Sequence, residues 1–120
     1  MLPRFSCHQF GDMLYFIMQI IARRSLRRFW ERHPQAEGPL RAWFSAVSKA
    51  RWKAPGDVKR QFGTTVDFVA DNRVIFDVGG NKYRLIGHVS YGFGRILIKF
   101  VGTHAEYDRI NPETVSWQKR

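Results

Sequence analysis

The sequence predicts an α+β fold in which an N-terminal helical hairpin packs on a small antiparallel β-sheet, with a short C-terminal helix. Apolar residues recur at helical spacing between residues 26 and 47. The period then changes, and β-branched and aromatic runs separated by turn residues follow between residues 68 and 103. A chain of 120 residues, 44% of them hydrophobic, is long enough to build one core.

Residues 1–17 show no clean periodicity. We expect Met18 to be the natural start and residues 1–17 to be a non-native or disordered N-terminal extension. Residues 18–120 are then expected to form a single domain. It opens with residues 18–22 (MQIIA), a short apolar run that predicts a buried or pairing strand.

Two helices are predicted next. Ser25 is the expected N-cap of the first, whose apolar side holds Leu26, Phe29 and Trp30 before the break at His33-Pro34. Pro39 fits the first turn of the second. The apolar stripe of that helix consists of Leu40, Trp43, Phe44 and Val47. These helices should form a hairpin whose aromatic residues belong to the core rather than to a base-stacking surface.

The second half of the chain predicts an antiparallel meander. Residues 52–63 indicate a loop with one helical turn, for which Asp57 is the candidate cap. Strands are expected at residues 68–69, 74–78, 82–91 and 95–103, with turns at 71–72, 79–81 and 92–94. A last helix is expected around residues 105–110, before Pro112, and the tail to Arg120 is expected to be frayed.

Charge narrows the class of partner. Twenty Lys and Arg residues against ten Asp and Glu give a formal net charge of +10. This excess favours nucleic acid, an acidic protein or an anionic membrane surface. The arginine pairs at residues 23–24 and 27–28 fit a solvated face as well as they fit a surface for RNA or a partner protein.

The few cysteines and histidines exclude other classes. The single cysteine, Cys7, cannot form an internal disulfide, and the four histidines lack zinc-site spacing, so we expect no metal and no cofactor. The apolar stretch at residues 13–21 is too short to span a bilayer and lacks a secretory cleavage pattern. These features predict a protein of the reducing cytoplasm without a membrane segment.

The meander carries the groups that metal-independent RNA cleavage requires. Such cleavage needs a base for the 2′-hydroxyl, cations for the phosphoryl oxygens and an acid for the departing 5′-oxygen. Suitable side chains follow one another within a short span: Arg84, His88, Lys99, His104 and Tyr107.

Strand register decides which of these side chains share a face, because a one-residue slip moves every side chain to the other face. A two-residue turn at residues 93–94 sets His88 opposite Lys99, with Arg84 on the same face. A three-residue turn at residues 92–94 instead separates Lys99 from that face.

The neighbouring hairpin offers a partner for the arginine. A two-residue turn within residues 79–81 sets Asp77 on the face of Arg84, where its carboxylate can orient the guanidinium. Each candidate also has a structural explanation, since a single basic residue on a strand is commonly just solvated. His88 suits a core histidine, and Tyr107 suits packing at a helix end.

Three segments carry a resemblance to a known family: WKAPGDVKRQF at 52–62, VIFDVGGNKYRLIGHVSY at 74–91 and VGTHAEYDRI at 101–110. From Met18 onward the chain resembles the HigB family of toxins from type II toxin–antitoxin systems. The resemblance implies a RelE-like fold and a metal-independent endoribonuclease. Such a toxin cleaves mRNA, on the ribosome or away from it, by attack of the 2′-hydroxyl, and so inhibits translation. It also implies a HigA-type antitoxin that neutralises the toxin.

The resemblance carries over the basic strand residues Lys82, Arg84 and Lys99 and the terminal residues His104 and Tyr107, with Asp108 beside them. From these positions and the strand register we expect two sets of site residues. The catalytic set is Arg84, Lys99, His104 and Tyr107. The RNA-binding set is Asn81, Lys82, His88 and Asp108. In this assignment His104 is the general base or acid, assisted by Tyr107, while the cations stabilise the transition state.

Two rival functions share the predicted fold. One is a basic domain that binds RNA or protein without catalysis, and the other is a gyrase-inhibiting toxin of the related ParE branch. The succession of GGNKYRL and THAEYD favours the ribonuclease branch.

Overall fold

The computed structural model describes residues 18–116. The predicted N-terminal extension, residues 1–17, lies outside the described residues. The helices and strands are, in order, β1 (Gln19–Ile21), α2 (Arg24–Arg32), α3 (Glu37–Ser48), α4 (Pro55–Phe62), β2 (Val66–Val69), β3 (Arg73–Val78), β4 (Tyr83–Ser90), β5 (Arg95–Thr103) and α5 (His104–Tyr107). Short 3₁₀ turns stand at Pro34–Ala36 and Gly63–Thr65.

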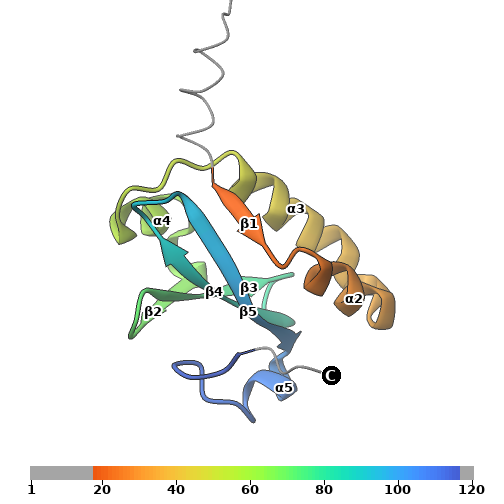
Figure 1. Ribbon diagram of the computed structural model, residues 1–120. Helices are drawn as coiled ribbons and strands as arrows, with labels where there is room; N and C mark the ends of the chain where they lie inside the picture. The colour runs from red at the N-terminus through yellow and green to blue at the C-terminus, as the bar shows by residue number, and fades with distance from the viewer. Residues whose placement is uncertain (1–17, 117–120) are drawn as a thin grey trace, which may run out of the picture.

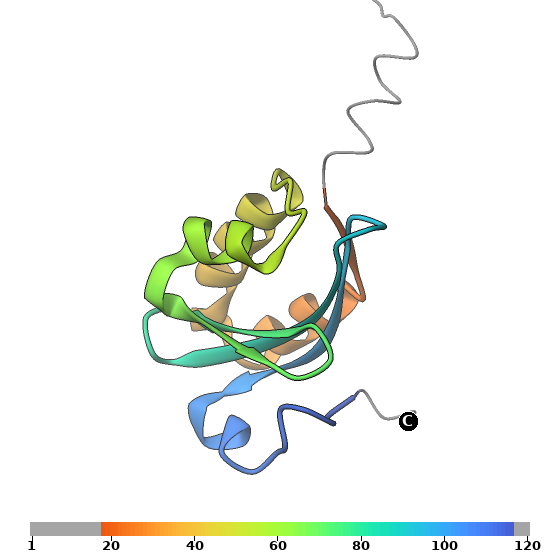
Figure 2. The same cartoon turned by 90° about the vertical axis from the view of Figure 1, so that its left-hand side faces the viewer.

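The strands form one sheet in the order β1-β5-β4-β3-β2 (Figure 1). Neighbouring strands are antiparallel except β1 and β5, which are parallel. Helices α2, α3 and α4 lie on one face of this sheet, and α5 lies on the other side with the residues that follow it (Figure 2). The predicted α+β architecture is therefore confirmed.

The core lies between the three helices and the sheet. The helices bury Leu26, Phe29, Leu40, Trp43, Val47 and Val58, each at most 5% exposed. The strands bury Val74, Phe76, Leu85, Val89, Ile96, Ile98 and Val101 in the same cluster. Full burial of one such side chain stabilises the fold by about 1.5–3 kcal/mol. Because this face of the sheet is tightly packed, the sheet can hold the side chains on its other face and at its ends in fixed positions.

The helical hairpin forms as predicted, except at its first cap. Ser25 was the expected N-cap, but α2 begins at Arg24, and Arg23 occupies the cap position without a side-chain hydrogen bond. The reason is Ala22, whose φ of 73° turns the chain early and lets its carbonyl accept from the Ser25 amide at 2.9 Å. The helix ends before Pro34, which has no amide hydrogen to donate.

The third helix is longer than the single turn predicted. α4 spans Pro55–Phe62, and Asp57 lies in its first turn rather than at its cap. The carboxylate of Asp57 nevertheless accepts from the backbone amides of Lys53 at 2.8 Å and Ala54 at 3.2 Å. Val58 is fully buried, so core packing extends a helix that local sequence signals left short.

The hairpin between β3 and β4 has the predicted register. Asp77 pairs with Arg84, and the turn closes through a hydrogen bond from the Lys82 amide to the Gly79 carbonyl at 3.3 Å. Gly79 and Gly80 both have positive φ, of 66° and 70°, a conformation that glycine adopts without strain.

The hairpin between β4 and β5 does not have the predicted register. Ser90 pairs with Arg95 across a connection of residues 91–94, and His88 faces Leu97 rather than Lys99. A β-bulge follows, in which Lys99 is the extra residue between two paired neighbours. The bulge has a physical cause in the core. Ile98 and Val101 lie three positions apart, and a regular strand would send them to opposite faces, yet both are buried in the same cluster.

The second face of the sheet is covered in part by the C-terminal segment. Arg73, only 7% exposed, donates from Nη1 to the carbonyls of Pro112 at 3.2 Å and Val115 at 2.7 Å. The prediction of a frayed tail is therefore wrong for these residues, because a buried guanidinium ties them to the sheet. No helix within residues 18–116 is long and apolar enough to cross a membrane.

Candidate active site

The side chain of Arg84 is fixed by its neighbours. It stands at the start of β4 and is 11% exposed. Its Nε lies 3.1 Å from Oδ1 of Asp77, and its Nη2 donates to Oδ1 of Asn81 at 2.6 Å. Such charge-assisted contacts hold the guanidinium in one orientation at the end of the sheet. The cation is thus positioned by the strand register and the glycine turn together.

Helix α5 begins where β5 ends, beside the same turn. Thr103 caps it: its Oγ1 accepts from the Glu106 amide at 3.2 Å, and its own amide donates to the Glu106 carboxylate at 2.9 Å. The amide of His104 donates to the Lys82 carbonyl at 3.0 Å. The two capping bonds fix the start of α5, and the bond from His104 to Lys82 attaches the helix to the β3–β4 turn.

His104 lies at the first position of α5 and is 46% exposed. Its Nδ1 is 3.2 Å from Oδ2 of Asp108, one helical turn later. A carboxylate at one ring nitrogen orients an imidazole and selects its tautomer. The other nitrogen, Nε2, has no hydrogen-bond partner within the described part of the chain, so a ligand can exchange a proton with it.

Tyr107 completes the cluster. The Arg84 guanidinium lies 5.7 Å from the centre of its ring. Burial is the largest cause of a raised pKa for Tyr107, whose ordinary value is 10.0, and Arg84 partly offsets this shift. Nearby carboxylates raise the pKa further: Asp67, Asp77 and Asp108. The phenol therefore keeps its proton at neutral pH and can act as a donor.

Six of the eight residues predicted for the site gather at one end of the sheet. The β3–β4 turn and the start of β4 provide Asn81, Lys82 and Arg84. Helix α5 and its C-cap provide His104, Tyr107 and Asp108. The contacts described above connect the two groups through Lys82 and through the ring of Tyr107.

Of the other two residues, His88 lies apart from this cluster, and Lys99 has no hydrogen bond or ion pair to it within the described part of the chain. His88 is four positions beyond Arg84 on β4, about 13 Å along the strand, and its Nε2 lies 3.7 Å from Asp71. Fully buried Ile86 stands between them on the same face. Lys99 is the extra residue of the β-bulge in β5, opposite the middle of β4.

Sequence reasoning missed Asp67. This residue is exposed on β2, and its effect on the pKa of Tyr107 places its carboxylate near the cluster. The strand was predicted to begin at residue 68, so Asp67 fell outside it. Extending the β2–β3 hairpin by one register step would have found it, since Asp67 pairs with Ile75 and shares a face with Asp77.

The arrangement joins the three chemical requirements stated for phosphodiester cleavage. An oriented guanidinium can neutralise phosphoryl oxygens, an exposed imidazole can take up a proton, and a protonated phenol can release one. All three belong to elements anchored to one turn.

Comparison with known proteins points in the same direction. Residues 36–110 match the HigB toxin family, described as the RelE-like toxic component of a toxin–antitoxin system. The mRNA interferase toxin HigB of Escherichia coli (strain K12) is 32% identical over 92 residues, which cover 76% of this chain and 88% of that protein. The mRNA interferase HigB of Shigella flexneri gives the same values. That of Escherichia coli O6:H1 is 24% identical over 94 residues, or 78% and 91% of the two chains.

Proposed function

Because this chain belongs to the HigB family of RelE-like toxins, we propose that it acts as a metal-independent endoribonuclease that cleaves mRNA and thereby inhibits translation. The observation that carries the proposal is the cluster of Arg84, His104 and Tyr107 at the end of the sheet. Family membership alone fits a toxin of any mechanism, whereas this cluster supplies a cation, a base and an acid.

The proposed reaction is an internal displacement at phosphorus. His104 takes the proton of the 2′-hydroxyl, and the 2′-oxygen attacks the adjacent phosphorus. The bond to the 5′-oxygen breaks, and Tyr107 donates its proton to that leaving oxygen. Arg84 stabilises the charge that builds on the phosphoryl oxygens, which contributes about 3 kcal/mol for one preorganised donor. The products are a 2′,3′-cyclic phosphate and a 5′-hydroxyl.

Other residues of the cluster have supporting parts. Asp108 orients His104 through the contact of 3.2 Å at Nδ1. Asn81 and Lys82, both exposed on the turn, bind the RNA backbone next to the cleaved bond. His88 lies away from the three reacting side chains and has no part in this step. Lys99, the bulge residue of β5, is the second cation proposed to face the phosphoryl oxygens. His88 remains a candidate contact for RNA further along the strand.

The partner and the setting belong to the same proposal. A toxic component of a toxin–antitoxin system implies an antitoxin, and the resemblance makes this a HigA-type protein. The toxin then works in the cytoplasm, where mRNA and the ribosome are found.

The test is incubation of the purified chain with end-labelled RNA in the presence of a metal chelator. We expect discrete fragments that end in a 2′,3′-cyclic phosphate and begin with a 5′-hydroxyl. A parallel reaction contains gyrase and supercoiled DNA. The proposal would be refuted if RNA stayed intact both as free transcripts and on translating ribosomes. It would also be refuted if cleavage stopped when metal ions were removed. Loss of gyrase activity without RNA cleavage would assign the chain to a gyrase-inhibiting mechanism.

A further inference from the structure

Helix α2 carries a row of exposed arginines that the candidate active site does not use. Arg24, Arg28 and Arg32 follow one another at four-residue spacing. On a helix surface such residues lie about 5–6 Å apart between Cβ atoms, which is close to the spacing of successive phosphates in an extended nucleic-acid strand. The whole row covers about 12 Å of helix axis.

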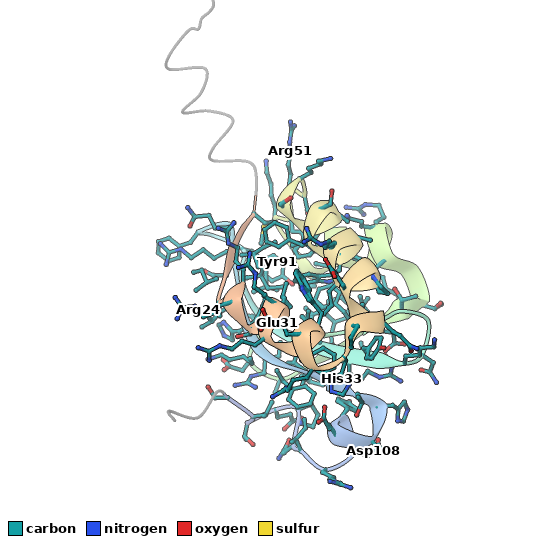
Figure 3. All side chains as sticks on the ribbon, turned by 90° about the vertical axis from the view of Figure 1, so that its right-hand side faces the viewer. Arg24, Glu31, His33, Arg51, Tyr91 and Asp108 are labelled. Atoms are coloured by element: carbon teal, nitrogen blue, oxygen red, sulfur yellow. The ribbon has the colours of Figure 1, made fainter. Side chains whose placement is uncertain are left out.

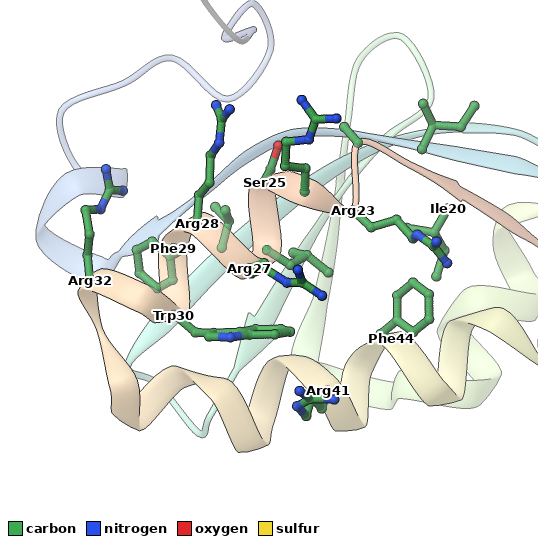
Figure 4. A pocket seen from close by; sticks show the side chains of 15 residues that line it. Ile20, Arg23, Ser25, Arg27, Arg28, Phe29, Trp30, Arg32, Arg41 and Phe44 are labelled. Atoms are coloured by element: carbon green, nitrogen blue, oxygen red, sulfur yellow. The ribbon is translucent and has the colours of Figure 1, made fainter.

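These arginines lack acidic partners. None of the three forms an ion pair with a carboxylate among residues 18–116, although Glu31 is on the same helix. They line a groove of about 1360 Å³ around α2 whose lining contains no Asp or Glu. Figure 4 shows Arg28 and Arg32 projecting from α2 on the side away from α3. The row is therefore an uncompensated positive surface.

Two aromatic side chains of the groove already have a guanidinium of the same protein beside them. The guanidinium of Arg41 lies 5.0 Å from the centre of the Trp30 ring, and that of Arg23 lies 5.7 Å from the Phe44 ring. Among the large hydrophobic residues that line the groove, Ile21, 39% exposed, is then the main open apolar surface. An amphipathic acidic segment of a protein needs open apolar surface beside the arginines, whereas a phosphate backbone needs only the cations.

The row leads toward the candidate active site. Phe29 of α2 packs edge-on against Tyr83, with ring centres 5.7 Å apart, and Tyr83 pairs with Thr103, the residue before His104. Figure 3 shows Asp108 and α5 just beyond the C-terminal end of α2, where His33 is labelled. Arg32, in the last turn of α2, is therefore at the end of the row nearest to α5.

We propose that Arg24, Arg28 and Arg32 form a track for the phosphate backbone of single-stranded RNA, which runs along α2 and enters the cluster of Arg84, His104 and Tyr107. The proposal rests on the proposed ribonuclease function and extends it to a second binding surface. Guanidinium groups suit this task because they bind phosphate oxygens with two parallel hydrogen bonds.

The test measures binding of RNA that the protein cannot cleave. The probes are 2′-O-methyl oligonucleotides of mixed sequence, about 4 and about 12 nucleotides long, and fluorescence anisotropy is recorded over a range of salt concentrations. The track variant is Arg24→Gln/Arg28→Gln/Arg32→Gln. The matched control, Lys49→Gln/Lys59→Gln/Arg60→Gln, removes the same charge from exposed residues at the end of α3 and on α4. Thermal melting confirms that both variants fold.

We expect the wild-type protein and the control to bind the long probe more tightly than the short one. The track variant should lose this gain while its affinity for the short probe stays unchanged. Each single-strand phosphate contact contributes about 0.7 to the slope of log K against log salt. The slope for the long probe should therefore fall by about 2 in the track variant.

Three results would overturn the track: an unchanged slope, an equal loss for both probes, or an equal loss in the control. Retained RNA binding together with lost binding of poly-glutamate would assign the arginines to an acidic protein. The assay needs no cleavage, so its outcome is separate from that of the ribonuclease test. If the protein binds RNA along α2 but does not cleave it, the proposed ribonuclease function is wrong, while the proposed RNA-binding surface on α2 is supported.

Discussion

At the scale of single residues, Arg84 combines burial with orientation. Its side chain is 11% exposed and bonds both to Asp77 on the neighbouring strand and to Asn81 in the turn. A cation held in this way does not have to reorganise when charge develops on a substrate, which is why preorganised donors contribute strongly to catalysis. The same contacts also explain why one arginine of a very basic chain stands out as a site residue.

Replacing this cation is therefore the sharpest test of the site. Arg84→Ala should lower the rate of RNA cleavage about a hundredfold or more, measured with the labelled RNA described above. Induction of Arg84→Ala or of His104→Ala should also no longer arrest growth, at unchanged soluble yield. Lys49→Ala, at an exposed position after α3, serves as the control and should remain toxic. Full toxicity of both site variants would remove the assignment.

The raised pKa of Tyr107 predicts a particular pH dependence. The phenol must be protonated to donate, and because its pKa lies above the ordinary value of 10.0, this form persists through neutral pH and is lost only as the pH rises past that value. Tyr107→Phe should cleave slowly and should lack the alkaline fall in rate. The pH–rate profile, corrected for background hydrolysis with Arg84→Ala, checks this. An alkaline fall that survives in Tyr107→Phe contradicts the role.

At the scale of elements, the position of α5 depends on Gly102. A Cβ at this residue would lie 2.8 Å from the Glu106 carboxylate and 2.6 Å from the Phe100 ring. Both side chains would have to move, and Glu106 would lose its bond to the Thr103 amide. The glycine thus permits the capping box that starts α5 beside the turn.

Substitution of this glycine tests the coupling between cap and site. Gly102→Ala should lower cleavage activity because α5 shifts, while the free energy of unfolding falls by only about 1 kcal/mol, as for other lost helix caps. Gly92→Ala is the control, since a Cβ there meets nothing within 4 Å. Cleavage assays with urea denaturation of both variants give the comparison. Wild-type activity in Gly102→Ala would mean that α5 need not hold its position.

At the scale of the whole molecule, the sheet separates an apolar core on one face from a face that carries charged side chains. The helices cover one face and form the apolar core, while the other face carries Arg73, Asp77, Arg84 and His88. The C-terminal segment lies against that second face (Figure 2). The position of this segment depends on Arg73, which binds the carbonyls of Pro112 and Val115.

Loss of the buried Arg73 guanidinium should release the C-terminal segment from the second face of the sheet, while the core between helices and sheet stays folded. Arg73→Leu should lower the free energy of unfolding by about 1.5–3 kcal/mol, the usual contribution of a hydrogen bond to a charged group. Amide exchange should accelerate in residues 111–116. Arg109→Gln, exposed in the same region, is the control. Urea denaturation and hydrogen exchange report both effects, and unchanged protection of residues 111–116 in Arg73→Leu would show that other contacts hold the segment.

Some of this organisation was determined by the sequence itself. The periods of the apolar residues indicated α2, α3 and the strands of the meander, because a helix and a half-buried strand repeat at different intervals. The glycine turn at residues 79–81 fixed the pairing of Asp77 with Arg84 locally. The family resemblance gave most of the residues that gather at the end of the sheet.

Tertiary packing decided the rest. The β4–β5 connection, with glycines at 92 and 94, allows several registers, and the joint burial of Ile98 and Val101 selected the one with a bulge at Lys99. The same is true of the approach of Asp67 to Tyr107 and of Arg73 to the C-terminal carbonyls. Local sequence fixes what each segment prefers, but contacts between distant segments depend on which arrangement buries the whole core, and no single segment contains that information.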